Sequence, residues 1–367
     1  MPYGSVNADL MTTSDGVSSS GLYGFKNRII NGAMVIDQRN AGASVTNTTG
    51  YVYGLDRYSF IGSSSSKFTF QQSSTAPTGF VNSYLITSSA ATSLGASDYY
   101  FMRQNIEGFN VADLGWGTAS AQTVTLSFWV RSSLTGTFGG CLKNSAEDRS
   151  YPFSYTISSA NTFEYKTITI AGDTTGTWLT NNGTGINLTL GLGIGSSISG
   201  TAGAWAGANY YSCTGATSVV GTNGATFYLT GVQLEKGSTA TSFDYRPYGT
   251  ELQLCQRYYY LLSAASNLNT FFHNVAADGT NHALGVVTFP QVMRTSPSLT
   301  TSGTASNYRL YMGGAFTTCN AVPSIDQSSP YSSNVGYSVA SGLTNGQGGC
   351  AAANGSTAAI LGFSAEL

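Results

Sequence analysis

Residues 227–259 read FYLTGVQLEKGSTATSFDYRPYGTELQLCQRYY, and this stretch indicates the end of one β domain and the start of another. From Phe227 to Leu234 apolar side chains alternate with small or polar ones, as in a strand with one face on a core. Pro247 lacks a backbone donor and disfavours helical geometry before it, so we read the residues around it as a turn. A new apolar run begins at Leu252. We therefore predict a domain boundary at about Gly249, followed by the first strand of a second domain.

Composition and spacing favour antiparallel β structure along the whole chain. Only 9% of the 367 residues are charged, against an average of about 25%, and there are 45 glycines. Short β-branched and aromatic runs lie between Gly, Ser, Asn and Thr turns, which is typical of sandwiches, and we expect very little helix. In residues 123–131 the side chains of Val124, Leu126, Phe128 and Val130 share one face, and Trp129 lies on the other.

The runs predict an all-β fold in two parts. A jelly-roll β-sandwich contains strands at 58–61, 67–71, 84–87, 99–104, 124–130, 163–170, 186–192 and 226–233. A smaller C-terminal β-sandwich contains strands at 255–262, 271–275, 285–289, 308–311, 335–339 and 358–363. Residues 1–24 are polar, rich in Gly and Ser and without periodicity, so they predict an extended N-terminal arm that has no core of its own.

Three patterns follow one another along the chain. Residues 27–40 read NRIINGAMVIDQRN, residues 231–247 read GVQLEKGSTATSFDYRP and lead to ELQLCQRYY at 251–259, and residues 289–297 read FPQVMRTSP. They resemble, in the same order, parts of tail fibre proteins of tailed bacteriophages. The first two resemble the opening and the end of a jelly-roll module similar to carbohydrate-binding modules, and the others resemble the opening and a strand of a trimeric tip domain.

The resemblance covers most of the chain and implies an organisation and a function. Residues 1–24 would be an arm that attaches to a phage tail, baseplate or adaptor protein, 25–249 a carbohydrate-binding-like jelly roll, and 250–367 the tip of a homotrimer. The protein would be a structural component of the virion, a short tail fibre that binds host surface glycan. A head fibre or capsid decoration protein is the alternative within virions. A glycan depolymerase and a cellular lectin are alternatives of other classes.

Charge and cysteine usage bear on location and partners. A net charge of −2 without a basic stripe argues against nucleic-acid binding, and no run of 18 apolar residues predicts a membrane span. The start, MPYGSVN, has no features of a secretory signal, so we expect assembly in a host cytoplasm before incorporation into the virion as a tail appendage. The cysteines are then reduced, small buried residues, with a Cys319–Cys350 bridge as an alternative after particle release; all five are Cys141, Cys213, Cys255, Cys319 and Cys350.

Catalytic and metal-binding patterns are missing from the sequence. The only close acidic pair, Glu147 and Asp148, lies in a predicted loop, and adjacent residues make a poor acid and base couple. His273 and His282 fit no catalytic motif, and His282 fits a hairpin turn. We therefore predict no enzymatic activity, no catalytic residue, no metal and no cofactor. The related carbohydrate-binding jelly rolls imply one alternative, a structural calcium held by Asn31, Asp37, Glu235 or Asp244.

Aromatic residues in Gly-rich or loop sequence are the candidate ligand-binding residues. Trp and Tyr rings bind the flat apolar faces of sugars, and neighbouring polar groups fix the hydroxyls. Each ring has an alternative role, either in closing an end of a sandwich or in a core or trimer interface. The candidates are Trp116, Trp178, Trp205, Tyr210 and Tyr211 in the first domain and Tyr308, Tyr311 and Phe316 in the second.

Overall fold

The computed structural model describes residues 26–367, which form two compact units, residues 26–251 with Leu367 and Leu252–Glu366. The predicted arm at residues 1–24 lies outside the described residues. Strands make up 43% of the structure and helices 6%, which confirms the all-β prediction. The short 3-10 helices are Gly108–Asn110, Ala112–Leu114, Ser196–Ile198 and Ala305–Asn307.

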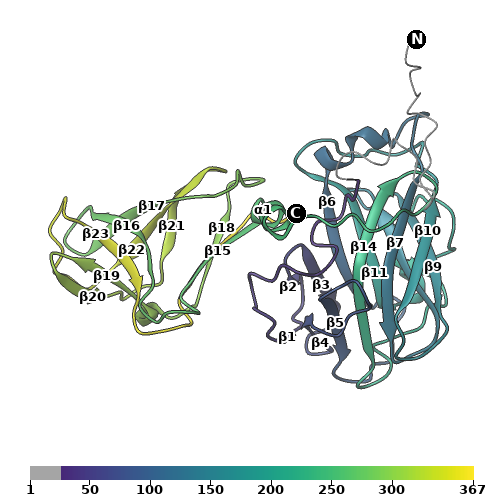
Figure 1. Ribbon diagram of the computed structural model, residues 1–367, viewed down its shortest axis with the longest axis horizontal. Coiled ribbons are helices and arrows are strands. Elements are labelled where there is room, and N and C mark those ends of the chain that lie inside the picture. The colour runs from purple at the N-terminus through teal and green to yellow at the C-terminus, as the bar shows by residue number, and fades with distance from the viewer. Residues whose placement is uncertain (1–25) are drawn as a thin grey trace, which may run out of the picture. The chain divides into compact units, whose positions relative to one another are not determined.

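The first unit is a sandwich of two six-stranded antiparallel sheets (Figure 1). The first sheet contains, in spatial order, β1 (Val45–Thr46), β4 (Phe68–Ser73), β5 (Ser83–Ser88), β14 (Thr226–Lys236), β7 (Val124–Ser132) and β10 (Glu164–Ile170). The second contains β2 (Val52–Leu55), β3 (Tyr58–Gly62), β6 (Tyr99–Glu107), β11 (Thr184–Ile194), β8 (Gly136–Lys143) and β9 (Ser150–Ile157). A short parallel pair joins β12 (Ser199–Gly200) to β13 (Ser212–Cys213). All eight strands predicted for this unit are present, and the structure adds β2, β8 and β9 and the two-residue strands β1, β12 and β13.

Strand β7 shows how the side-chain period builds the sandwich. Leu126, Phe128 and Val130 are fully buried between the sheets, while Trp129 lies on the outward face, as predicted. Each such buried aliphatic or aromatic side chain contributes about 1.5–3 kcal/mol relative to exposure. The inward side chains of β7 therefore fix which side of the first sheet faces solvent.

Strand β14 changes phase in the middle. Phe227 and Leu229 point into the core with one phase, whereas Val232 and Leu234 point into it with the other, and all four are fully buried. The pairing of β14 with β7 shifts register between Thr230 and Gln233, so an extra residue is accommodated as a bulge. Gly231 has φ +61 there, a left-handed conformation that glycine adopts without the cost other residues incur.

The motif NRIINGAM serves to fix the first unit's opening segment against β14. The Asn27 side chain donates to the Val232 carbonyl at 3.0 Å and accepts from the Leu234 amide at 3.1 Å. The Asn31 amide group donates to the carbonyls of Ile36 and Asp56. A Cβ on Gly32 would lie 2.2 Å from the Val232 carbonyl oxygen, so only glycine allows this approach. The polar residues Asn27 and Asn31 thus have an architectural role.

The stretch after Pro247 differs from the prediction. Tyr248–Gln256 forms a helix, α1, and the predicted strand at 255–262 begins only at Tyr259. Proline is accepted in the first helical turn, where its missing donor costs nothing, and the Glu251 amide donates to the Pro247 carbonyl. The apolar run from Leu252 predicts a strand, but its Leu and Gln residues and the preceding Glu251 are good helix formers.

The second unit is a smaller β-sandwich. One sheet contains β15 (Tyr259–Ser263), β24 (Ile360–Ser364) and β18 (Ser298–Thr301). The other contains β20 (Ala315–Thr318), β19 (Tyr308–Met312), β23 (Gly348–Ala353), β16 (Phe271–Ala277), β17 (His282–Thr288), β22 (Ser332–Ser338) and β21 (Ser324–Ser328). His282, predicted to lie in a hairpin turn, is the first residue of β17, directly after the turn that follows β16, and its Nδ1 lies 2.8 Å from the Asp278 carboxylate. No helix among residues 26–367 is long and apolar enough to cross a membrane.

Candidate functional site

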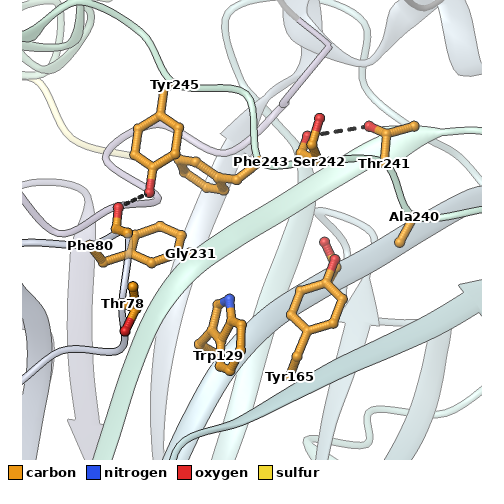
Figure 2. Close-up of a pocket in the computed structure, with 12 residues that line it drawn as sticks. Thr78, Phe80, Trp129, Tyr165, Gly231, Ala240, Thr241, Ser242, Phe243 and Tyr245 are labelled. Atoms are coloured by element: carbon orange, nitrogen blue, oxygen red, sulfur yellow. Dashed lines mark hydrogen bonds between the residues drawn. The ribbon is translucent and has the colours of Figure 1, made fainter. Parts of the chain in front are cut away.

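A groove of about 490 Å³ lies on the outward face of the first sheet, and its floor is aromatic (Figure 2). Trp129 on β7 pairs across the strands with Tyr165 on β10, and their ring centroids are 5.4 Å apart at 45°. Both rings point away from the core because their neighbours Phe128 and Ile168 point toward it. Tyr165 is 43% exposed. The floor therefore offers two adjacent ring faces to a ligand.

Three further rings form a wall on the other side of the groove. Phe80 lies 5.1 Å from Phe243 and 5.4 Å from Tyr245, and the last two are 4.8 Å apart. The Tyr245 hydroxyl donates to the Gly79 carbonyl, which joins the segment after Lys236 to the loop before β5. Figure 2 shows these three rings together, with Trp129 and Tyr165 across the groove from them. The wall is thus a packed cluster contributed by two segments far apart in sequence.

The polar groups of the groove are hydroxyls. The exposed Thr78 and Ser242 offer hydroxyls at the rim, and Ser127 is buried beneath the floor. The Thr241 hydroxyl donates to Glu235 Oε2 at 2.6 Å, so its oxygen can still accept. Partial burial raises the pKa of Tyr245, so this phenol stays neutral over the physiological range. None of the twelve residues that line the groove is charged. Such a surface suits an uncharged ring with hydroxyls around it.

Gly231 allows the Phe80 and Trp129 rings to pack close to β14. A Cβ at this position would lie 2.7 Å from Phe80 Cζ and 3.0 Å from Trp129 Cδ1. Glycine therefore permits both the bulge of β14 and the close approach of a wall ring and a floor ring. The bulge connects the fold of β14 directly to the shape of the groove.

The structure gathers the predicted tryptophans at a different place. The rings of Trp116, Trp178 and Trp205 meet edge to face, with centroids 4.7 to 5.4 Å apart, and Tyr151 packs on Trp205. Each indole N–H donates to a backbone carbonyl, of Gln122, Thr175 and Ala171 respectively. The three rings pack against the core, and Trp116 is only 8% exposed. This is the alternative role considered for them, the closing of one part of the sandwich.

Tyr211 lies in an ionic cluster on the second sheet. Its ring stacks on Phe101 with centroids 4.7 Å apart, and Lys143 Nζ is 3.5 Å from its centroid. Glu147 accepts from Arg103 at 2.8 Å, from Lys143 at 3.0 Å and from the Tyr211 hydroxyl at 3.1 Å. Burial alone would raise the pKa of Glu147, but the two cations outweigh it and lower the value to about 2. Burial, with Arg103 nearby, lowers the pKa of Lys143 to about 8.

The two members of the acidic pair lie in the predicted loop between β8 and β9 but have different surroundings. Glu147 has φ +57 and is held by two cations, while Asp148 accepts from the Asn144 side chain at 2.6 Å. Tyr210, the remaining candidate of the first unit, lies between β12 and β13 and packs over Gly200, where a Cβ would meet its ring at 2.3 Å. Glu147 is therefore a structural element of the β8 to β9 connection, whereas Asp148 is exposed.

The candidates of the second unit separate into two groups. Tyr308 is fully buried and its hydroxyl donates to the Ile360 carbonyl at 2.7 Å, so the prediction that it contacts a ligand is wrong. Tyr311 and Phe316 are 38% and 49% exposed, with ring centroids 4.7 Å apart. The Arg309 guanidinium lies 3.6 Å from the Phe316 ring centroid. The ligand-binding prediction for these two exposed rings stays a prediction.

The possible calcium ligands serve other purposes. The Asp244 carboxylate accepts from the backbone amides of Lys26 and Asn27, and that of Asp37 accepts from the amides of Asn40 and Gly42. Glu235 accepts from Thr241 and from the Gln233 side chain. Among residues 26–367 no three His, Cys, Asp or Glu side chains gather to hold a metal ion. The five cysteines are free thiols, and all but Cys350 are buried.

The groove residues are not among the residues predicted from the sequence, because the floor rings of Trp129 and Tyr165 lie in strands and not in Gly-rich or loop sequence. Trp129 was placed on the outward face of its strand but was not taken as a site residue. An outward Trp in a strand whose other face is apolar was the available signal. No local sequence pattern predicts that Trp129 lies near Phe80 and Tyr245.

Comparison with known proteins finds slight structural likenesses. No protein-family model and no curated protein matches the sequence. Solved structures that are similar include the enzymatically active domain of tailspike protein 4 of bacteriophage CBA120, at 11% identity and a TM-score of 0.30 over 57% of this chain and 21% of that one. A family 11 carbohydrate-binding module of the Clostridium thermocellum cellulase Lic26A-Cel5E matches at 10% identity and 0.27 over 53% of this chain and all of the module. The module TmCBM61, solved with β-1,4-galactotriose, matches at 10% identity and 0.26 over 49% of this chain and 88% of that one.

Proposed function

We propose that this protein is a non-enzymatic adhesive component of a phage virion that binds a host surface glycan in the groove of its first unit. The observation that carries the glycan-binding part is the uncharged aromatic groove with its floor of Trp129 and Tyr165. Its volume of about 490 Å³ falls within the roughly 300–1,000 Å³ of small-molecule sites. The virion part comes from the sequence resemblance to tail fibre proteins.

Binding without hydrolysis is the favoured activity. Glycoside hydrolysis needs two carboxyl groups about 5 to 10 Å apart on either side of the scissile bond. The residues that line the groove include no Asp or Glu, and the nearby Glu235 carboxylate is occupied by Thr241 and Gln233. The groove can therefore stack and hydrogen-bond a sugar but has no pair to protonate a leaving oxygen and activate water.

We propose a short tail fibre as the particular appendage and a homotrimer as its form. Phe271, Tyr311 and Phe316 are exposed in the second unit, with Tyr311 in contact with both other rings, and association would cover such a face. Three weak glycan sites on each fibre raise avidity by roughly 10² to 10⁴ over one site. Residues 1–24 would attach the fibre to the tail, after assembly in the host cytoplasm.

Glycan binding is tested by titrating purified protein with oligosaccharides released from the host surface. Trp129→Ala should weaken binding about tenfold, since one stacking partner is lost. Phe109→Ala removes an exposed aromatic ring of the same unit outside the groove and should leave binding unchanged. Trp178→Ala tests the tryptophan cluster in the same assay. If Trp178→Ala abolishes binding and Trp129→Ala does not, the site lies at that cluster and the groove assignment is wrong.

The same preparation tests the virion role and the absence of catalysis. The purified protein should block adsorption of the phage and leave the length of the host polysaccharide unchanged. Protein that lacks residues 1–24 should still fold and bind but should no longer enter virions. Shortening of the polysaccharide by the wild-type protein would contradict the non-enzymatic proposal and support a depolymerase.

A further inference from the structure

Arg131 lies on the outward face of the first sheet, directly beyond the floor of the groove. It is two residues from Trp129 on β7, so both side chains point the same way and their Cα atoms are separated by about 7 Å. Across the strands Arg131 pairs with Tyr228 of β14, and Trp129 pairs with Thr230. These two pairs are neighbours on the outward face of the sheet. A chain of sugars that stacks on Trp129 and continues along β7 therefore reaches Arg131.

Two aromatic rings hold the Arg131 guanidinium. Its central carbon lies 4.9 Å from the ring centroid of Tyr228 and 5.9 Å from that of Phe163. These two rings are 6.1 Å apart and nearly perpendicular. Contacts of this kind fix the plane of the guanidinium without using its N–H donors. The cation is thus positioned before any ligand arrives.

No anion accompanies this cation among residues 26–367. Arg103, Arg149 and Arg246 each have a carboxylate partner, at 2.8, 2.7 and 3.3 Å. The described structure contains no hydrogen bond and no ion pair of the Arg131 side chain, and its Nε is buried without a partner. The two terminal nitrogens of Arg131 are accessible and have no partner within the described chain, so they are available to an anion supplied from outside.

The nearest acidic side chains are already occupied. Glu164, at the start of β10, is on the opposite face of that strand from Tyr165 and accepts from Lys166 at 2.6 Å and from the amides of Ser158 and Ser159. On this face of the sheet Glu235 lies three rows from Arg131, after the rows of Trp129 and Ser127. Its carboxylate accepts a hydrogen bond from the Thr241 hydroxyl. The face is therefore cationic at the Arg131 end and neutral along the groove.

We infer that the groove takes an acidic glycan, with a sugar stacked on Trp129 and a carboxylate or phosphate substituent of a neighbouring sugar bound by Arg131. This inference rests on the proposed glycan-binding function and specifies its ligand class. Guanidinium N–H groups form paired hydrogen bonds with the two oxygens of a carboxylate or phosphate. Charge at one end also gives the ligand a direction on the sheet, with its acid group away from Glu235.

The test uses matched pairs of oligosaccharides of the host surface, each acidic chain beside a neutral counterpart made by carboxyl reduction or removal of phosphate. Wild-type protein should bind the acidic member about 10- to 100-fold more tightly at low salt, and this ratio should shrink as salt rises. Arg131→Gln should remove the ratio and leave binding of the neutral member unchanged. Arg131→Lys should keep part of it, since a lysine retains the charge but not the paired geometry.

Lys236→Gln is the control, because it removes one positive charge near the far end of the same sheet and should leave the ratio intact. Thermal melting of each variant shows whether it is folded. If Arg131→Gln is not folded, the partial loss of the ratio in Arg131→Lys tests the inference in its place. Equal binding of the paired oligosaccharides by wild type, or a ratio that persists in Arg131→Gln, would overturn the acidic-ligand inference and leave the proposed function standing. Failure of wild type to bind any member would overturn both.

Discussion

Replacement of Gly231 by alanine should weaken both the fold of the first unit and ligand binding. The residue has φ +61, where an L-residue costs about 1–2 kcal/mol. The added Cβ also falls 2.7 Å from Phe80 Cζ, closer than Cβ atoms come to other heavy atoms in proteins, and 3.0 Å from Trp129 Cδ1, which is at the short end of such contacts. Displacement of packed rings adds about 1–3 kcal/mol. We expect the free energy of unfolding to fall by about 3 kcal/mol in total.

Gly224→Ala provides the matched control. Gly224 has φ +77 and precedes the same strand, but a Cβ there would meet nothing within 4 Å. This variant should lose only the backbone cost of about 1–2 kcal/mol and should bind glycan as wild type does. The difference between the two variants therefore isolates the displacement of the rings.

Chemical denaturation followed by tryptophan fluorescence measures the first effect, since all four tryptophans lie in the first unit, and titration with host oligosaccharide measures the second. Gly231→Ala should weaken binding several-fold, because its Cβ moves a floor ring. Equal loss of stability in the two variants, or wild-type affinity in Gly231→Ala, would refute the assignment of Gly231 to the floor of the groove.

Three further outcomes are expected. Burial lowers the pKa of His273 from 6.5 to about 4. The free energy of unfolding of the second unit should therefore have its full value above pH 6.5 and fall by up to about 3 kcal/mol as the pH is lowered toward 4. Denaturation of His273→Phe should show a smaller dependence on pH. Glu147→Gln should destabilise the first unit by about 2 kcal/mol because Lys143 and Arg103 lose their carboxylate, and unchanged melting would count against the cluster. Mass measurement in solution should give a trimer, and deletion of residues 250–367 should lower the oligomeric state; a monodisperse monomer at micromolar concentration would contradict the trimer.

The helix α1 and the strands β8 and β9 show where local pattern was insufficient. The apolar run from Leu252 fits a strand and a helix equally over so short a length, and the start of α1 depends on its position directly after Pro247. Strand β8 reads GTFGGCLK, and its glycines weaken the strand signal. Cβ atoms on Gly139 and Gly140 would collide with Ser212 and Thr189, so these glycines are needed for close packing between segments. A short stretch of sequence does not reveal this requirement.

The alternation in β7 was determined by the sequence alone, because a strand sends successive side chains to opposite faces whatever surrounds it. That rule placed Phe128 in the core and Trp129 outside it. The groove was decided only by the tertiary structure. It forms because β14 pairs with both β5 and β7, strands that precede it by more than 90 residues, and this brings Phe80 and Tyr245 to the side of Trp129. No local sequence pattern predicts contact between aromatic residues so far apart in the sequence, because the order of strands in a sheet depends on the packing of the whole core and not on any one segment.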